Sequence, residues 1–317
     1  MENKEIGGYI ELDRCELPML HEEGYALNCG RNCLVYLIRA RQIKKILLPK
    51  FLCDSIESVC IREQVEVKYY SIGENFLPVN INQDNDEWVY IVNYYGQIGN
   101  KKIKELAHKY KNIIIDHAQA YFQMPVQGID TLYTCRKFFG VADGAFLFTD
   151  VHLEEEIDFD ESYNRINFLV GRFERTAPEF YKEYVYNNER FRTEAVKRMS
   201  KLTENMLRSI NYNIVREKRE KNFEYLHKYL HEYNKLKLFI PKGAFMYPFY
   251  ISNGMLLRKK LQEKKIYIPI LWPNVLQQCR ENELEYDMAC NILPLPVDQR
   301  YDYSEMDIIV SSIKQYL

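Results

Sequence analysis

Three short segments place a reactive or charged side chain directly after an apolar run. Asp116 follows the run Ile113-Ile114-Ile115, and Lys137 follows a second apolar segment and stands among aromatic residues. The third segment, Asn28-Cys29-Gly30-Arg31-Asn32, puts a glycine turn in front of an amphipathic helical pattern. Ligands of α/β proteins collect where the strands of a parallel sheet end. The sequence therefore predicts that these three segments meet at one edge of a sheet.

The carboxylate of Asp116 needs a cationic partner, because burying an ionised carboxyl group alone is expensive. A protonated pyridine nitrogen would serve, and that charge pair is what allows pyridoxal phosphate (PLP) to act as an electron sink. Gln119, three residues further on, would then hydrogen-bond the neighbouring ring hydroxyl. The alternative is that Asp116 only caps the turn that follows it.

Lys137 is predicted to lose solvation among its aromatic neighbours, which would lower its pKa and free its amine to form a Schiff base. Thr134 lies three residues before it and would donate its hydroxyl to a cofactor phosphate. Taken alone, the segment is better explained by an exposed lysine beside buried phenylalanines.

The turn at Gly30 is predicted to bind phosphate. Free backbone N–H groups and the positive end of a helix attract anions, glycine permits close backbone approach, and Arg31 adds charge. A single glycine before a helix is weak evidence, and the Gly-x-Gly-x-x-Gly pattern of dinucleotide-binding proteins is absent from the segment.

Together these segments resemble the DegT/DnrJ/EryC1/StrS family of PLP-dependent, mostly sugar aminotransferases, a branch of fold type I. Asp116-His117-Ala118-Gln119-Ala120 is similar to the family's Asp-x-Ala-Gln-Ala motif, and Asn93-Tyr94-Tyr95-Gly96 to its His-x-x-Gly loop. Arg198-Met199-Ser200 resembles its Arg-Met-Ser, and Leu293-Pro294-Leu295-Pro296 its strand near the C-terminus. The similarity extends from Ala26 to the C-terminus.

The resemblance implies two catalytic residues, Lys137, which would hold the cofactor as an internal aldimine, and Asp116. The implied cofactor-binding residues are Gly30, Arg31, Asn32, Cys53, Asn93, Asp116, Gln119, Thr134 and Lys137. Tyr95, Arg198 and Arg300 are the candidates for substrate binding, although Arg300 could equally pair with Asp302 or Glu305. Two features depart from the family: only about 25 residues precede the phosphate turn, and Val196 replaces an asparagine expected to reach the neighbouring subunit's cofactor.

The resemblance also implies a reaction. Glutamate would donate an amino group to a keto group on a nucleotide-linked sugar, as in polysaccharide biosynthesis, in a homodimer with shared active sites. Two alternatives stay open: another PLP-dependent reaction, and a non-catalytic binding or scaffold module that keeps the fold. Sugar dehydratases related to this family carry histidine in place of the lysine, so Lys137 argues against that branch.

Alternating strand and helix patterns predict an α/β fold with a mainly parallel sheet flanked by helices, and a smaller α+β C-terminal part. The predicted strands are Lys45-Leu48, Glu66-Tyr70, Trp88-Asn93, Asn112-His117, Thr131-Thr134, Ala145-Thr149, Gly243-Ser252 and Tyr267-Leu271. The predicted helices are Asn32-Arg41, Asp54-Glu63, Lys101-Tyr110, Met255-Lys264 and Ser304-Tyr316. The domain division is an N-terminal segment 1–24, a large PLP-binding domain 25–165, a helical linker or spine 166–232 and a small domain 233–317.

Composition and charge exclude several classes of protein. The formal net charge is -2, which gives no basic footprint for nucleic acid. No apolar run approaches the ~20 residues of a membrane span, and we expect a cytoplasmic protein. The eight cysteines form no Cys-x-x-Cys pair, so neither disulfides nor a metal site is predicted. All histidines except His117 are expected at the surface.

Overall fold

The computed structural model describes residues 6–317, and its main feature is an eight-stranded sheet. The strand order is β1-β8-β7-β6-β5-β2-β3-β4, with a separate two-stranded sheet, β10-β9. The strands are β1 Tyr25–Leu27, β2 Lys45–Pro49, β3 Glu66–Ile72, β4 Pro78–Val79, β5 Glu87–Val92, β6 Ile113–Asp116, β7 Asp130–Thr134, β8 Ala145–Phe148, β9 Met246–Tyr250 and β10 Ile292–Pro296. The six predicted strands of the large sheet are confirmed.

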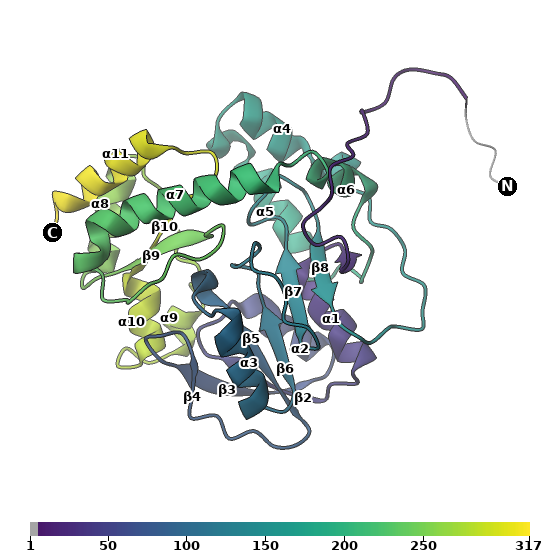
Figure 1. Ribbon diagram of the computed structural model, residues 1–317, viewed down its shortest axis with the longest axis horizontal. Coiled ribbons are helices and arrows are strands. Elements are labelled where there is room, and N and C mark those ends of the chain that lie inside the picture. Colours follow the sequence, from purple (N-terminus) through teal and green to yellow (C-terminus); the bar gives the residue numbers. More distant parts are fainter. Residues whose placement is uncertain (1–5) are drawn as a thin grey trace.

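Helices cover both faces of the large sheet, as the sequence predicted (Figure 1). The α-helices are α1 Gly30–Ala40, α2 Asp54–Arg62, α3 Asn100–Lys109, α4 Asn167–Glu174, α5 Tyr181–Arg190, α6 Lys201–Leu207, α7 Tyr212–Leu230, α8 Gly254–Glu263, α9 Val275–Gln278, α10 Leu284–Asn291 and α11 Tyr303–Lys314. Short 3₁₀ helices are η1 Tyr94–Gly96, η2 Tyr163–Arg165, η3 Ala177–Phe180 and η4 His231–Tyr233.

The chain reverses direction across the sheet between β2 and β5. The connection through α2 moves from β2 to β3, whereas the connection through α3 moves from β5 to β6, in the opposite direction along the sheet. Right-handed crossovers then place α2 and α3 on opposite faces. The point where such connections diverge is where α/β sheets open a crevice beyond their strand ends.

The central strands are recognisable in the sequence because both of their faces are buried. All residues of β6 and β7 are buried, as are all residues of β5 except the half-buried Trp88. Parallel strands covered by helices on both sides therefore read as continuous apolar runs rather than alternating ones. The strands β1, β2, β3, β5, β6 and β7 run in one direction, so their carboxyl ends lie along the same edge.

The segment predicted as a helical spine is broken into several elements. It contains α4, η3, α5 and α6 before the long helix α7, which joins the two sheets (Figure 1). The helices α7, α8 and α11 then pack with β9 and β10 around a second apolar core. However, residues such as Trp272, Val275 and Ile292 belong to the core of the large sheet. The domain boundaries therefore stay a prediction.

One predicted strand, Tyr267-Leu271, is wrong. The segment is buried at Ile268 but forms no strand. Pro269 lies in its middle and lacks the N–H group that a strand ladder requires. The second strand of the small sheet is instead β10, whose residues pair with β9 from Ile292 to Pro296.

None of the helices among residues 6–317 combines the length and apolar character needed to cross a membrane. All eight cysteines are free thiols, and no cluster of potential metal ligands occurs in the described part of the chain.

Candidate active site

The predicted reactive residues lie at the carboxyl edge of the large sheet. Asp116 is the last residue of β6, Thr134 is the last of β7, and Lys137 follows three residues later. Gly30 begins α1, three residues after the end of β1. The three segments that the sequence singled out therefore share one edge, and β6, which carries Asp116, lies next to β5 at the reversal of the sheet.

Asp116 presents a buried carboxyl group with no salt-bridge partner within residues 6–317. Its side chain is 7 % exposed. One oxygen accepts a hydrogen bond from the Tyr90 hydroxyl at 2.9 Å, and the other accepts from the Ala118 N–H at 2.7 Å. Burial raises the pKa of Asp116, and the positive charge of Lys137 opposes that rise. The two side chains therefore interact electrostatically, although twenty-one positions separate them in the sequence.

Lys137 differs from expectation in its surroundings. Its side chain is exposed, and its Nζ atom lies 5.6 Å from the centre of the Phe245 ring. The neighbouring Phe138 and Phe139 are buried. The expected loss of solvation is therefore wrong for the single chain, because the flanking phenylalanines point into the core while the lysine points out of it.

Helix α7 and the loop after β10 hold the Lys137 segment in place. The Phe138 carbonyl accepts hydrogen bonds from Arg219 Nη2 at 3.2 Å and from Gln299 Nε2 at 2.8 Å. Arg219 is 1 % exposed, and burial lowers its pKa to about 10. Sequence reasoning missed both residues, since neither lies near Lys137 in the chain or follows a strand of the large sheet.

The phosphate turn and the Lys137 loop contact each other directly. A side chain at Gly30 would lie 3.8 Å from Thr134 Cβ. Gly144 connects the same two segments, because its N–H donates to Asn28 O at 2.6 Å and its carbonyl accepts from Cys135 N at 3.0 Å. Gly144 has a φ of +109°, a conformation that glycine adopts without strain.

Asn32 serves the backbone of the turn rather than facing outward. It is fully buried, and its Nδ2 donates to Asn28 Oδ1 at 2.9 Å and to Ala195 O at 2.7 Å. Arg31 donates from Nη1 to Asn188 O at 3.3 Å. Cys29, the N-cap residue of α1, provides no side-chain cap hydrogen bond, so the start of this helix stays open to an anion.

The loop after β5 is fixed by two amides. Asn93 accepts from Ile98 N at 2.8 Å and donates to Ile98 O at 3.0 Å, which occupies its side chain within the loop. Gln119 is 2 % exposed, and its Oε1 accepts from Tyr95 N at 2.8 Å. Tyr95 is buried with a φ of +53°, in the left-handed region that bulky residues rarely enter. Gln119 thus stabilises a strained turn beside the site.

Cys53 and Phe51 follow β2 at the same edge. Cys53 is half-buried at the start of α2, and its Sγ lies 2.9 Å from Ser55 Oγ. Phe51 is 1 % exposed and packs against Trp272, with ring centres 4.4 Å apart. Phe51 is therefore part of the core, whereas Cys53, the predicted cofactor-binding residue of this segment, is half-buried at the edge.

Arg198 and Arg300 both have partners of their own. Arg198 is exposed with its guanidinium carbon 4.1 Å from the centre of the Phe159 ring. Arg300 binds Asp298 through two hydrogen bonds of 2.7 and 2.9 Å. The alternative partners suggested for Arg300 are wrong, because Asp302 and Glu305 instead form a capping box at the start of α11.

Two histidines behind Asp116 are buried. His21 is 1 % exposed, lies stacked on Tyr133 with ring centres 4.0 Å apart and is 2.6 Å from Tyr121 O at its Nε2. The expected surface position of His21 is therefore wrong. Burial lowers the pKa of His21 to about 4 and that of His117 to about 3.

Because His21 and His117 are buried as neutral side chains, the protein should lose folding stability in mild acid. In the unfolded chain they bind protons below a pKa of about 6.5, whereas in the folded chain they stay neutral. Stability should thus fall by about 1.4 kcal/mol per pH unit for each histidine as the pH drops from roughly 6.5 towards 4. Urea midpoints measured across this range should show a shallower slope for His21→Gln and an unchanged slope for His108→Gln, whose histidine is exposed. Equal slopes in all three proteins would contradict the burial.

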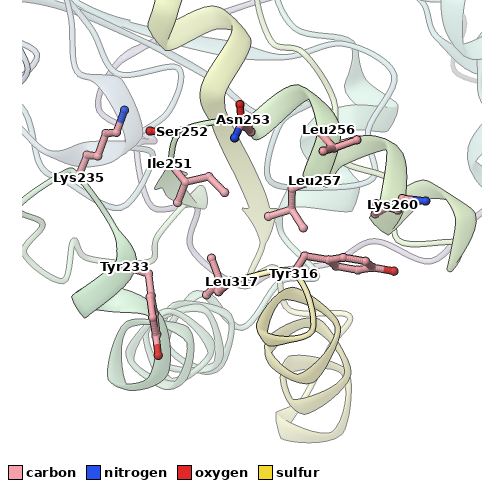
Figure 2. A pocket seen from close by; sticks show the side chains of 10 residues that line it. All are labelled: Tyr233, Lys235, Ile251, Ser252, Asn253, Leu256, Leu257, Lys260, Tyr316 and Leu317. Carbon is pink, nitrogen blue, oxygen red and sulfur yellow. The ribbon is translucent and has the colours of Figure 1, made fainter.

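A separate hollow of about 480 Å³ lies in the C-terminal part of the chain (Figure 2). Ile251, Leu257 and Leu317 face one another there, and none of the predicted site residues lines it. This hollow therefore does not belong to the site at the strand ends.

Comparison with known proteins identifies the fold. No family model and no curated protein matches the sequence. Among solved structures, a DegT DnrJ EryC1 StrS aminotransferase from Brucella abortus has a TM-score of 0.63 at 15% identity, over 92% of this chain and 85% of that one. Sugar aminotransferase CalS13 from Micromonospora echinospora has a TM-score of 0.63 at 11% identity, over 96% and 94%.

A third structure is NtdA from Bacillus subtilis with bound cofactor PMP, which has a TM-score of 0.64 at 13% identity over 92% of this chain and 72% of that one. The fold is thus that of the DegT/DnrJ/EryC1/StrS sugar aminotransferases, as the sequence motifs predicted.

Proposed function

We propose that this chain is a PLP-dependent aminotransferase that moves an amino group from glutamate to a keto group on a nucleotide-linked sugar. The strongest support is the placement of Asp116 and Lys137 at one sheet edge, where the lysine charge acts on the buried carboxyl group. The fold shared with sugar aminotransferases agrees with this proposal.

The residues present fit the three ends of the cofactor. Asp116 is a buried carboxylate without an ion-pair partner in residues 6–317, as a pyridine N–H would require. The open start of α1, with Gly30 and Arg31, suits the phosphate. Lys137 provides an exposed amine at the same edge of the sheet. Gln119 keeps its Nε2 group free of partners in the described chain, in position to donate to a ring hydroxyl.

Bound PLP supplies an electron sink, which accepts the electron pair released when a bond to the substrate's amino-bearing carbon breaks. Asp116 would keep the ring nitrogen protonated, and Tyr90 and Ala118 hold that carboxylate in one orientation. Lys137 would hold the cofactor and, as a free amine, would carry a proton to and from the substrate carbon as general acid and base. Arg219 and Gln299 fix the loop from which it acts.

Glutamate bleaching of the bound cofactor tests this reaction. The purified protein with PLP should absorb in the visible range, and glutamate should remove that band as the amino group passes to the cofactor. A keto-sugar nucleotide should then restore it. A band that persists in the presence of glutamate would exclude glutamate as the donor, and alanine and aspartate serve as alternative donors in the same assay.

A homodimer would complete the site, and an exposed apolar surface supports one. The α4–α5 face exposes large side chains of which several are aromatic: Val170, Phe173, Tyr181, Tyr184 and Tyr186. Monomers rarely expose such patches, and a two-fold axis allows a patch to cover itself. The face adjoins the phosphate turn through Asn188. Sedimentation of Phe173→Glu should show dissociation, and a monomeric wild type would contradict the dimer.

A further inference from the structure

Two arginine side chains near the start of α1 contact the same residue, Asn188. Arg31 is the second residue of the helix, and Arg136 immediately precedes Lys137. Asn188, near the end of α5, accepts from both: its backbone oxygen from Arg31 Nη1 at 3.3 Å, and its Oδ1 from Arg136 Nη1. The Phe191 ring centre lies 4.5 Å from the guanidinium carbon of Arg136. One short helix thus holds both guanidinium groups beside the phosphate turn.

Neither guanidinium forms a salt bridge in the described chain, and Asp143 acts on Arg136 only from beyond salt-bridge distance. Within residues 6–317 no carboxylate lies within 4.0 Å of Arg31 or Arg136, whereas the nearby Arg165 lies 2.7 Å from Asp160. The Nε atoms of Arg31 and Arg136 are both buried without a hydrogen-bond partner. Burial lowers the pKa of Arg136, and the charge of Arg31 adds to the effect. Two adjacent unpaired cations are costly unless an anion joins them.

The surroundings favour a phosphate group as that anion. The helix start adds a partial positive charge, and the Thr134 hydroxyl on the adjoining strand end makes no hydrogen bond within the described chain. Planar guanidinium groups match phosphate oxygens through paired hydrogen bonds, which adds geometric selection to charge. A dianionic phosphate monoester would neutralise both arginines at once.

We propose that Arg136, together with Arg31, binds the phosphate of the cofactor, so that a single chain supplies two cations to this subsite. The assignment rests on the proposed function for the identity of the ligand. The anion site itself rests only on the arginines, and inorganic phosphate is therefore the probe. Val196, whose side chain is apolar, takes no part in this site.

Inorganic phosphate should stabilise the cofactor-free full chain against heat, at an ionic strength matched with chloride. Arg31→Gln and Arg136→Gln should each weaken the phosphate affinity roughly 10- to 100-fold, the loss expected for a hydrogen bond to a charged group. Arg136→Lys keeps the positive charge but loses the paired N–H donors of the guanidinium group. Its phosphate affinity should lie between those of wild type and Arg136→Gln. Arg172→Gln, at an exposed arginine of α4, should bind phosphate as wild type does.

The outcomes separate the anion site from the reaction. Lys137→Ala should retain phosphate binding while losing the covalent bond to PLP. If the arginine variants bind phosphate and PLP as tightly as wild type, the assignment of Arg31 and Arg136 is overturned while the proposed function stands. If phosphate binding depends on the arginines but PLP forms no bond with the wild type, the anion site stands and the proposed function fails. The affinity of Arg31→Gln decides the matter should Arg136→Gln fail to fold.

Discussion

Lys137→Ala is expected to lower the rate of amino transfer by roughly 10⁴-fold, the upper end of the range for a positioned general acid and base. The loss is this large because the same amine also holds the cofactor, so one substitution removes both roles. The visible absorbance of the PLP-bound protein should disappear with it. Since the side chain is exposed, the urea midpoint should stay close to that of wild type.

Lys101→Ala is the matched control for that experiment. Lys101 is also exposed and lies in the first turn of α3, which begins at the same edge of the sheet. This variant should keep the absorbance and the rate of wild type. A Lys137→Ala protein that transfers amino groups at an appreciable rate would remove Lys137 from the catalytic role.

Asp116→Asn is expected to lower the turnover roughly 10²- to 10³-fold, the usual effect of removing one preorganised electrostatic contact. The amide cannot keep the ring nitrogen protonated, but the cofactor should still bond to Lys137. The visible band should therefore remain while turnover falls. This combination distinguishes a role at the ring nitrogen from a loss of cofactor, and wild-type turnover in Asp116→Asn would refute it.

The same substitution should stabilise the cofactor-free protein at neutral pH. Burial raises the pKa of Asp116, so the ionised carboxylate destabilises the folded chain above its ordinary pKa of about 3.9. The gain in urea midpoint should vanish below that pH, where the carboxyl group is protonated in both states. Asp86→Asn is the control with the opposite sign, because Lys45, 2.9 Å away, lowers the pKa of that exposed aspartate.

The strand ends of the site could be predicted from sequence because their runs are buried on both faces. Ile113 to Ile115 read as a strand without any tertiary information, and the residue after such a run falls at the sheet edge in any parallel arrangement. Asp116, Thr134 and Gly30 were therefore placed correctly at one edge. The other parts of the site were predicted from the turn glycine and from the spacing of the motifs.

Contacts between distant segments could not be predicted in this way. Tyr90 reaches Asp116 from the neighbouring strand, and Asn188 reaches Arg136 across 52 positions, without any local pattern. The exposure of Lys137 depends on which way a loop turns its phenylalanines. His21 is buried because it stacks on the ring of Tyr133, a contact between distant positions that no sequence pattern predicts.

The most direct measurement is to locate the lysine that binds PLP. The full chain is incubated with PLP and treated with borohydride, which fixes any carbon–nitrogen bond between cofactor and lysine, and the digested peptides are then identified by mass. We predict one pyridoxyl group per chain, on Lys137. A folded protein that carries the label on another lysine, or carries none, would contradict the joint placement of this amine and the Asp116 carboxylate around one cofactor ring.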